Sequence, residues 1–345
     1  MNGEIMNQTT RKTVVFGEVL LRLSPPGAER FVQTSSFDAV FGGAEANAAA
    51  ALAGFGMPAS VVTKLPANEI GSACLASLRR HDTDTSLIAR GGDRIGIYYL
   101  EKGASLRPSK VIYDRRGSSF AQSLREDYDW EKIFSDASAF FFTGITPALG
   151  SGVREILSDA LAVCRAKSIP VFCDVNYRPT LWTIEEASSA MELLLPGVST
   201  LVINEEHAAL LFGVNSDRQE DDTRLEEIAK RLASRYDLGR VALTLRLSES
   251  SDVNVVSGAL YDAKTDRFVR SRSYRVGIVD RIGGGDAFSA GLIYGSLMGW
   301  DAEKTVGFAA AANALKHSIP GDALIASAEE VEALMLSDGT VRLRR

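Results

Sequence analysis

The stretch Asp280-Arg281-Ile282-Gly283-Gly284-Gly285-Asp286-Ala287-Phe288 places three consecutive glycines between a predicted strand and a predicted helix. Glycine permits positive φ angles and lets backbone N–H groups approach a ligand closely. The start of a helix adds unpaired N–H groups and the positive end of the helix dipole. Gly283, Gly284, Gly285 and Asp286 are therefore predicted to form an anion site with a carboxylate beside it.

Asp286 is expected at the cap of that helix, where its carboxylate can accept the proton of an attacking hydroxyl group. The alternative is that the glycines make only a tight turn and that Asp286 is only an N-cap, since aspartate is a preferred capping residue. The stretch is not a GxxxxGK[ST] phosphate loop, because no Gly-Lys-Ser/Thr follows it.

Before this stretch, predicted strands and helices alternate from about residue 138. Strands are expected at 139–145, 171–175, 201–203 and 241–245, and helices at 152–167, 184–195 and 225–235. This alternation indicates βαβ units and a mostly parallel sheet. Two further strands at 255–262 and 267–276 and helices at 287–298, 302–317 and 327–336 complete the pattern.

The N-terminal third is richer in β-forming residues. A strand is expected at 13–23, a helix at 44–55, and strands at 95–100 and 110–114. The segments near 18–40 and 92–118 are too rich in β-forming residues for helical layers, so we expect them to form a small lid sheet. The chain is thus predicted to be one α/β domain over residues 12–345, preceded by a disordered lead over residues 1–11.

Composition narrows the class of protein. The 345 residues are 46% hydrophobic and 24% charged, which is typical of a globular protein, and the net charge of −6 argues against broad nucleic-acid binding. No run of 18 apolar residues predicts a membrane span, and the polar N-terminus lacks a signal-peptide core. The three cysteines show no CxxC spacing, which fits a cytoplasmic protein without a disulfide framework or a zinc site.

The stretch from Asp280 to Phe288 resembles the C-terminal signature D-T-x-G-A-G-D-x-F of the ribokinase (PfkB) family. Gly42-Gly43-Ala44-Glu45-Ala46-Asn47 resembles the N-terminal G-G-x-x-x-N element of the same family. The resemblance spans essentially the whole chain. Within the family the sequence is most similar to 2-dehydro-3-deoxygluconate kinases, on the segments 96–99, 113–118, 174–178, 181–182 and 316–322.

The resemblance implies a Rossmann-like ribokinase fold with a β-sheet lid and a homodimer through the lids. It implies that Asp286 takes the proton of the C6 hydroxyl of a sugar acid while Gly283 to Asp286 cradle the γ-phosphate of ATP. The implied substrate contacts are Gly42, Gly43, Ala44, Glu45, Ala46, Asn47, Tyr98, Tyr113, Arg115 and Arg178. The implied nucleotide contacts are Asn176, Asn204, Arg246, Gly283, Gly285 and Asn313, and Glu205 or Glu206 would serve Mg²⁺ through water.

The basic residues of the lid agree with an acidic substrate. An otherwise acidic chain gathers seven of them in one region: Arg90, Arg94, Lys102, Arg107, Lys110, Arg115 and Arg116. A carboxylate is well matched by a guanidinium group, and we expect Arg115 to supply it. The alternative, favoured for most of the seven, is that they are solvated strand-edge charges. Tyr98 and Tyr113 are equally compatible with lid packing.

Three departures from the family pattern leave points open. Asp280-Arg281 stands where the family has Asp-Thr, so activation by potassium is not settled. Asn204-Glu205-Glu206-His207 has histidine where the family's N-x-x-E has glutamate, and it could equally be a helix start with acidic residues on the dipole. The segment 244–250 lacks the family's K-x-G-x-x-G loop, so we expect Arg246 in place of the lysine. Asn313 is either near the adenine or a solvated asparagine.

Rival functions make different demands. A fructokinase or ribokinase of the same family would not need Arg115, and a non-catalytic nucleotide sensor would not need Asp286. An NAD-dependent dehydrogenase needs G-x-G-x-x-G directly after the first strand, which the residues around Gly17 do not provide. Dimerisation follows from the residues as well, because Tyr99, Leu100, Val111 and Ile112 predict an apolar lid face that the core cannot cover.

Overall fold

The main sheet is built from strands that are apolar on both faces. All seven residues of β9 (Ala137–Thr143) are buried. Phe140 and Phe142 pack into the core on one side, and Ala139 and Phe141 pack into the core on the other. A parallel sheet needs this pattern because helices cover both of its faces.

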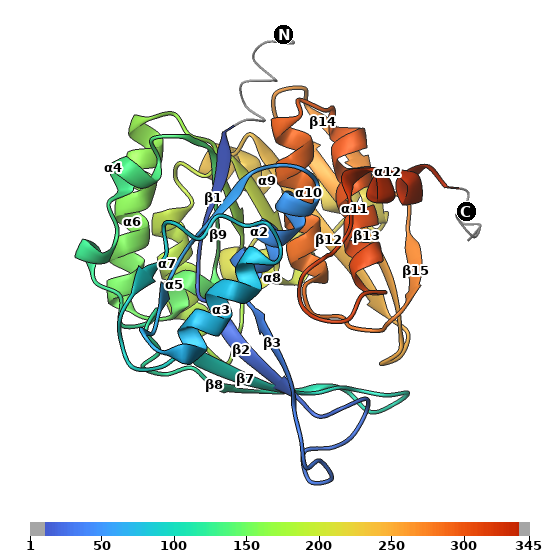
Figure 1. The fold of residues 1–345 in the computed structure, drawn as a ribbon. Coiled ribbons are helices and arrows are strands. Elements are labelled where there is room, and N and C mark those ends of the chain that lie inside the picture. Colours follow the sequence, from blue (N-terminus) through green and yellow to red (C-terminus); the bar gives the residue numbers. More distant parts are fainter. Residues whose placement is uncertain (1–10, 338–345) are drawn as a thin grey trace.

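The computed structural model describes residues 11–337, and within them nine strands form the main sheet (Figure 1). The strand order is β14-β13-β12-β11-β10-β9-β1-β4, with β15 beside β13. The bounds are β1 Lys12–Phe16, β4 Ala59–Val62, β10 Val171–Asp174, β11 Thr200–Ile203, β12 Arg240–Ser248, β13 Val253–Asp262, β14 Arg267–Arg270 and β15 Tyr274–Gly277. The pairs from β4 to β12 are parallel and those around β13 are antiparallel, which confirms the predicted α/β class.

Helices form a layer on each face of this sheet. One layer contains α4 Trp130–Ile133, α6 Ser151–Ala166, α7 Ile184–Leu194, α8 Glu205–Phe212 and α9 Asp221–Tyr236. The other contains α2 Ala44–Gly54, α3 Glu69–Arg79, α10 Gly284–Leu297, α11 Ala302–Lys316 and α12 Ala328–Leu336. The helices α10 and α11 pack closely, because a Cβ added at Gly291 would lie 2.6 Å from the Cα of Ala309. Small residues therefore bring α10 into the position that the site requires.

A second sheet projects from the body as a lid (Figure 1). Its order is β3-β2-β7-β8, from β3 Asp38–Gly42, β2 Leu20–Ser24, β7 Gly96–Glu101 and β8 Lys110–Asp114. Leu20, Tyr98 and Leu100 form its own small core. The small separate sheet expected from the sequence is thus present. Two short strands, β5 Lys64–Leu65 and β6 Ala89–Arg90, pair with each other outside both sheets.

Two of the predicted strands are wrong in extent. The strand predicted over 13–23 is two strands in different sheets, β1 and β2. A Cβ added at Gly17 would lie 2.1 Å from Glu45 Oε2, so the chain passes close against a buried carboxylate as it leaves the main sheet. The strand predicted over 267–276 is divided at 271–273, where Ser271 Oγ accepts a hydrogen bond from Gly258 N.

The remaining expectations concern the N-terminal lead, membrane spans and the cysteines. The predicted disordered lead, apart from Arg11, lies outside the described residues. No helix within residues 11–337 is long and apolar enough to span a bilayer. Cys74, Cys164 and Cys173 are buried free thiols.

The glycine loop yields a stability prediction. Gly283 has φ +85°, and a Cβ there would lie 1.7 Å from the carbonyl oxygen of Asp322, whereas a Cβ at Gly285 would meet nothing within 4 Å. Gly283→Ala should lower the free energy of unfolding by ~1–3 kcal/mol. The matched control Gly285→Ala should change it by less than ~1 kcal/mol, because alanine is tolerated in a helix. Denaturant unfolding measures both, and equal effects would contradict the strained position of Gly283.

Candidate active site

The candidate site is a cleft of about 1160 Å³ between the main sheet and the lid. It opens at the carboxyl ends of β10 and β11 and at the first turns of α2 and α10. Ligands of open α/β sheets bind outside the carboxyl ends of the strands. The lid contributes Tyr98, Tyr113 and Arg115 to the lining. Residues from both sheets thus enclose one cavity.

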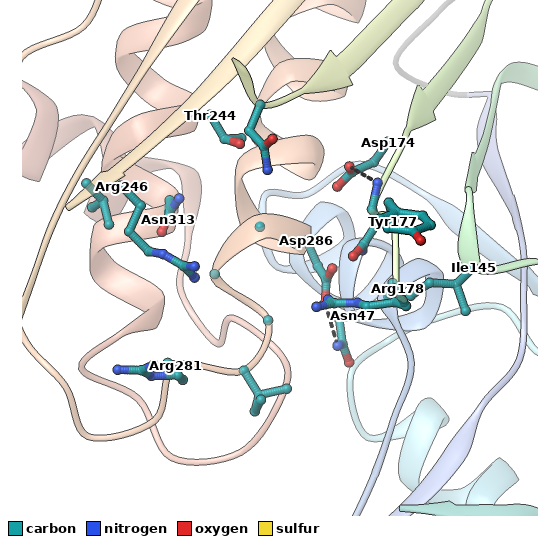
Figure 2. Close-up of a pocket in the computed structure, with 18 of the residues that line it drawn as sticks. Asn47, Ile145, Asp174, Tyr177, Arg178, Thr244, Arg246, Arg281, Asp286 and Asn313 are labelled. Carbon is teal, nitrogen blue, oxygen red and sulfur yellow. Dashed lines mark hydrogen bonds between the residues drawn. The ribbon is translucent and has the colours of Figure 1, made fainter. Parts of the chain in front are cut away.

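Asp286 lies in the first turn of α10, inside the cleft. The helix begins at Gly284 after the N-cap Gly283, so Asp286 is the third helical residue and makes no capping bond. The expectation that Asp286 is the cap is therefore wrong, and so is the alternative that it serves only as a cap. Its Oδ2 instead accepts a hydrogen bond of 2.7 Å from Asn47 Nδ2 (Figure 2). The two glycine motifs meet at this bond.

Burial controls the protonation of Asp286. Loss of water raises its pKa to about 7, and the negative charges of Asp174 and Glu45 act in the same direction. The hydrogen bond from Asn47 and the charge of Arg178 oppose this rise. Burial likewise raises the pKa of Asp174 to about 6. A carboxyl group with a pKa near neutrality is well suited to accept a proton in catalysis.

The N-terminal motif divides into lining and supporting residues. Gly43, Ala44, Glu45 and Asn47 line the cleft, whereas Gly42 and Ala46 are buried behind it. Glu45 accepts hydrogen bonds from Thr143 N at 2.9 Å, Thr143 Oγ1 at 2.7 Å and Thr146 Oγ1 at 2.9 Å. Its carboxylate therefore fixes the start of α2 against the end of β9.

The lid residues are held by acidic partners that the sequence reasoning missed. Arg115 Nε donates to Glu18 Oε2 at 2.7 Å, its Nη2 contacts the same oxygen, and Ser118 Oγ donates to Glu18 Oε1. Tyr98 OH donates to Asp322 Oδ2 at 2.6 Å. The available signals were weak: Glu18 lies within the predicted strand 13–23, and Asp322 is the last residue of the segment 316–322 that carries the resemblance.

Other lid cations are engaged within the protein. Arg94 pairs with Asp114 at 2.8 Å and Arg107 with Glu101 at 2.9 Å. Lys102 lies 3.7 Å from Asp280 Oδ2. These three cations are therefore paired within the protein, and none of them is the freely solvated strand-edge charge of the alternative.

Three arginines of the cleft have no carboxylate partner. Arg178, Arg246 and Arg281 line the cleft, and within residues 11–337 none of them is within ion-pair distance of an acidic group (Figure 2). Burial and the charges of Arg281 and Arg178 lower the pKa of Arg246. An uncompensated cationic group of this kind favours a polyanionic ligand. Arg281 was not predicted as a contact, although its departure from the family threonine was the available signal.

The remaining predicted nucleotide and metal residues also border the cleft. Residues 244–248 belong to β12, so the expected variant loop over 244–250 is mostly strand. Asn204 caps α8 by accepting from His207 N at 2.7 Å, as the helix-start interpretation required, and Glu205 pairs with Arg224 at 2.7 Å. Asn176 and Glu206 line the cleft.

Asn313 lies against the glycine loop rather than in solvent. A Cβ added at Gly284 would lie 3.0 Å from Asn313 Oδ1, and that oxygen has no hydrogen-bond partner among the described residues. The same part of the chain contains no group of three His, Cys, Asp or Glu side chains arranged to hold a metal.

The raised pKa of Asp286 predicts a pH-dependent stability difference. Between about pH 4 and pH 7 the unfolded carboxyl group releases its proton while the folded one retains it, so this group reduces stability as the pH rises. Asp286→Asn removes that penalty. Relative to wild type, the variant should gain ~1–4 kcal/mol of unfolding free energy between pH 4 and pH 8. Denaturant unfolding at both pH values tests this, and a difference independent of pH would contradict it.

The chain is similar to several known proteins. Residues 10–326 match the model of the pfkB family carbohydrate kinases. A solved structure of 2-dehydro-3-deoxygluconokinase from Thermotoga maritima is 48% identical, with a TM-score of 0.92, over 95% of this chain and 98% of that one. The 2-dehydro-3-deoxygalactonokinase of Haloferax volcanii is 31% identical over 94% of this chain and 97% of its own length. A putative ribokinase II from E. coli, solved with ATP and Mg²⁺, shares the fold at 18% identity and a TM-score of 0.78, over 94% of this chain and 99% of that one. With the family model spanning most of its length, the chain belongs to the pfkB family of carbohydrate kinases.

Proposed function

We propose that this kinase transfers the γ-phosphoryl group of ATP to the C6 hydroxyl of 2-dehydro-3-deoxygluconate. The observation that carries the proposal is the position of Asp286: a buried carboxyl group with a pKa of about 7, in the first turn of a helix and in the same cleft as three arginines that have no carboxylate partner. The Thermotoga maritima structure is named for this sugar acid, and the E. coli neighbour was solved with ATP.

Asp286 acts as the general base. Its Oδ2 is occupied by Asn47, so Oδ1 accepts the hydroxyl proton while the hydroxyl oxygen attacks the γ-phosphorus. The bond from that phosphorus to the ADP oxygen breaks as the new P–O bond forms. The first N–H groups of α10 lack intrahelical acceptors by position and receive the charge on the transferring group. Arg178, Arg246 and Arg281 neutralise the remaining phosphate charge.

Mg²⁺ would be held mainly through water. Glu206 lines the cleft, whereas Glu205 is paired with Arg224, so Glu206 is the better of the two predicted acidic partners. An indirect contact suits Mg²⁺, because this ion usually retains several waters in nucleotide sites. When bound, it neutralises phosphate charge and orients the triphosphate. Asn204, at the same helix start, would contact its hydration shell.

Arg115 recognises the substrate carboxylate in this proposal. Glu18 holds one edge of its guanidinium group, and the Tyr113 ring lies 5.5 Å from the guanidinium carbon. The remaining N–H groups are thereby oriented at the wall of the cleft. A neutral sugar would leave these donors without an acceptor, which disfavours a fructokinase or ribokinase activity. Glu18 thus orients the guanidinium group of Arg115.

The epimer 2-dehydro-3-deoxygalactonate is the second candidate substrate. The Haloferax volcanii relative is named for this acid. The two acids differ at one carbon, and both carry the carboxylate that Arg115 is proposed to bind. The same proposed contacts therefore accommodate either acid.

Loss of the base is the first functional test. Asp286→Asn should lower kcat by ~10²–10⁴-fold and leave the KM for ATP nearly unchanged, because only proton acceptance is lost. ADP release is measured with both sugar acids, fructose and ribose. The control is Asp217→Asn, at an exposed aspartate. An Asp286→Asn enzyme with wild-type kcat, or a preference of the unmutated enzyme for fructose or ribose, would overturn the proposal.

Removal of Arg115 is the second test. Arg115→Ala should raise the KM for the sugar acid at a cost of ~2–5 kcal/mol, which corresponds to about 30- to several-thousand-fold. The KM for ATP should not change, and Arg115→Lys should recover part of the loss because an ammonium group cannot form the planar fork.

Because Arg115→Ala also strands Glu18, a charge-matched variant is needed. The double variant Glu18→Gln with Arg115→Met removes both charges and leaves neither unpaired. It should show the same selective rise in the KM for the acid. A wild-type KM in this double variant would reduce Arg115 to a structural partner of Glu18.

We also propose a homodimer through the lids. Ile112 on β8 is 54% exposed and pairs with Tyr99 on β7, whereas Leu100 and Val111 pair with each other and line the cleft, so the predicted place of these two on the outer face is wrong. Light scattering at micromolar concentration should give a dimer, and Ile112→Asp should shift it to monomer because a charge is costly in an apolar interface. A monomeric wild-type protein would contradict this assembly.

A further inference from the structure

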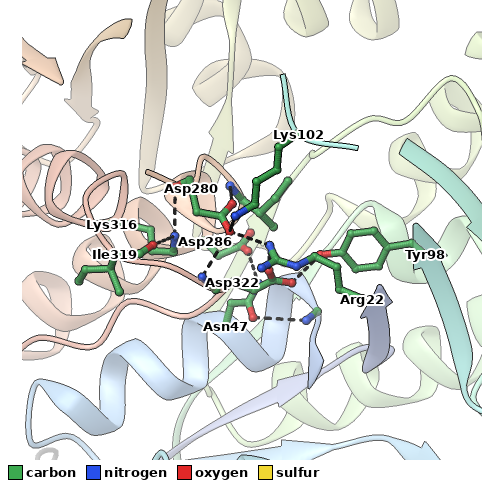
Figure 3. Close-up of polar contacts among 12 residues, drawn as sticks. Arg22, Asn47, Tyr98, Lys102, Asp280, Asp286, Lys316, Ile319 and Asp322 are labelled. Atoms are coloured by element: carbon green, nitrogen blue, oxygen red, sulfur yellow. Dashed lines mark hydrogen bonds and ion pairs between the residues drawn. The ribbon is translucent and has the colours of Figure 1, made fainter. Parts of the chain in front are cut away.

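Lys316, the last residue of α11, is completely enclosed, with a relative exposure of 0%. Lysine is almost never fully buried unless its charge is compensated. Within the described residues no carboxylate lies at ion-pair distance from its Nζ. The ammonium group instead donates to two backbone carbonyl oxygens, that of Asp280 at 3.3 Å and that of Ile319 at 3.0 Å (Figure 3).

The two carbonyl groups belong to the two segments that shape the anion site. Asp280 begins the glycine loop, and Ile319 lies in the segment that follows α11. The segments are also joined directly, because Val279 N donates to His317 O at 2.8 Å and Gly321 N donates to Asp280 Oδ2 at 3.3 Å. A Cβ added at Gly283 would lie 3.3 Å from Lys316 Cε. The lysine side chain therefore supports the glycine loop from behind.

Charged side chains surround the Lys316 ammonium group. Arg22 Nη1 lies 3.0 Å from Asp280 Oδ2 and 2.6 Å from Asp322 Oδ1, which fixes both carboxylates near Lys316 (Figure 3). The pKa of Lys316 is lowered, first by burial and also by the charge of Arg22, while Asp280, Asp322 and Asp286 oppose this shift. The Nζ atom lies among oxygen atoms and is screened from water.

We propose that Lys316 is a positioning residue for phosphoryl transfer and that its ammonium group serves as a covalently attached monovalent cation. Bound to two carbonyl oxygens, it fixes the glycine loop in the conformation that presents the N–H groups of α10 to the γ-phosphate. This inference rests on the proposed role of Gly283 to Asp286 as the anion site. Carbonyl oxygens that hold an ammonium group are also the ligands that K⁺ prefers. The wild-type enzyme therefore needs no dissolved monovalent cation.

The experiment compares Lys316→Ala and Lys316→Met with Lys304→Met, a control at a partly exposed lysine on the same helix. Steady-state kinetics are run in choline chloride, KCl and NH₄Cl at equal ionic strength. Both Lys316 variants should lose ~10- to 100-fold in kcat in choline chloride, because misplacement of a catalytic loop is costly. The KM for ATP should change far less than kcat. K⁺ or NH₄⁺ should restore Lys316→Ala in a saturable manner, and Lys316→Met, whose side chain fills the space, should stay low.

Three results would overturn the inference. The first is a wild-type kcat in Lys316→Met, and the second is a loss in Lys316→Ala that no small cation restores. The third needs no variant: wild-type activity that rises several-fold from choline chloride to KCl would show that a dissolved cation is required. The Asp286→Asn variant separates the two proposals, because its failure to lose activity would remove the anion-site assignment whatever the Lys316 variants do.

Discussion

The hydrogen bond from Asn47 Nδ2 to Asp286 Oδ2 joins the first turns of two helices through residues that are 239 positions apart in the chain. Both helices begin at the cleft, α2 directly after the lid strand β3 and α10 directly after the glycine loop. The bond lowers the pKa of a carboxyl group that burial and two acidic neighbours raise. Placement and chemistry of the site thus depend on the same contact. Glu45 stabilises the start of α2, because its carboxylate accepts a hydrogen bond from Thr143 N.

A second set of buried charges links the lid to the glycine loop. Arg22 comes from lid strand β2, and its partners Asp280 and Asp322 come from the two segments that flank the anion site. Tyr98, also from the lid, donates to Asp322. Buried charges tolerate the loss of a partner poorly, because the remaining charge is left uncompensated. The lid that would cover the sugar acid and the loop that would hold the phosphate are therefore one electrostatic unit.

The alternation of strands and helices, the lid and the two glycine motifs could be predicted because their signals are local. The spacing of apolar residues and a run of glycines can each be recognised within a short stretch of sequence. The corrections come from contacts between distant residues: Gly17 breaks the first strand because Glu45 lies against it, and Arg115 is held by a carboxylate 97 positions earlier. Arg246 lies in the long hairpin that β12 forms with β13. The segment 244–250 contains no glycine that would indicate this hairpin. The burial of Lys316 could not be predicted for the same reason. A lysine at the end of an alanine-rich helix is expected to be exposed, and only the structure shows that its Nζ donates to the carbonyl oxygens of Asp280 and Ile319.

The most direct test of the central claim is the pH dependence of kcat/KM for the sugar acid, in the wild type and in Asn47→Ala. The pKa of Asp286 is raised to about 7 by burial, and only the ionised form accepts a proton. The wild-type value should therefore rise about tenfold per pH unit at acidic pH and level off above neutrality. Asn47→Ala removes the hydrogen bond that lowers this pKa, so its acidic limb should move to higher pH. A wild-type profile already level at about pH 5, where an ordinary aspartate is ionised, would contradict the account.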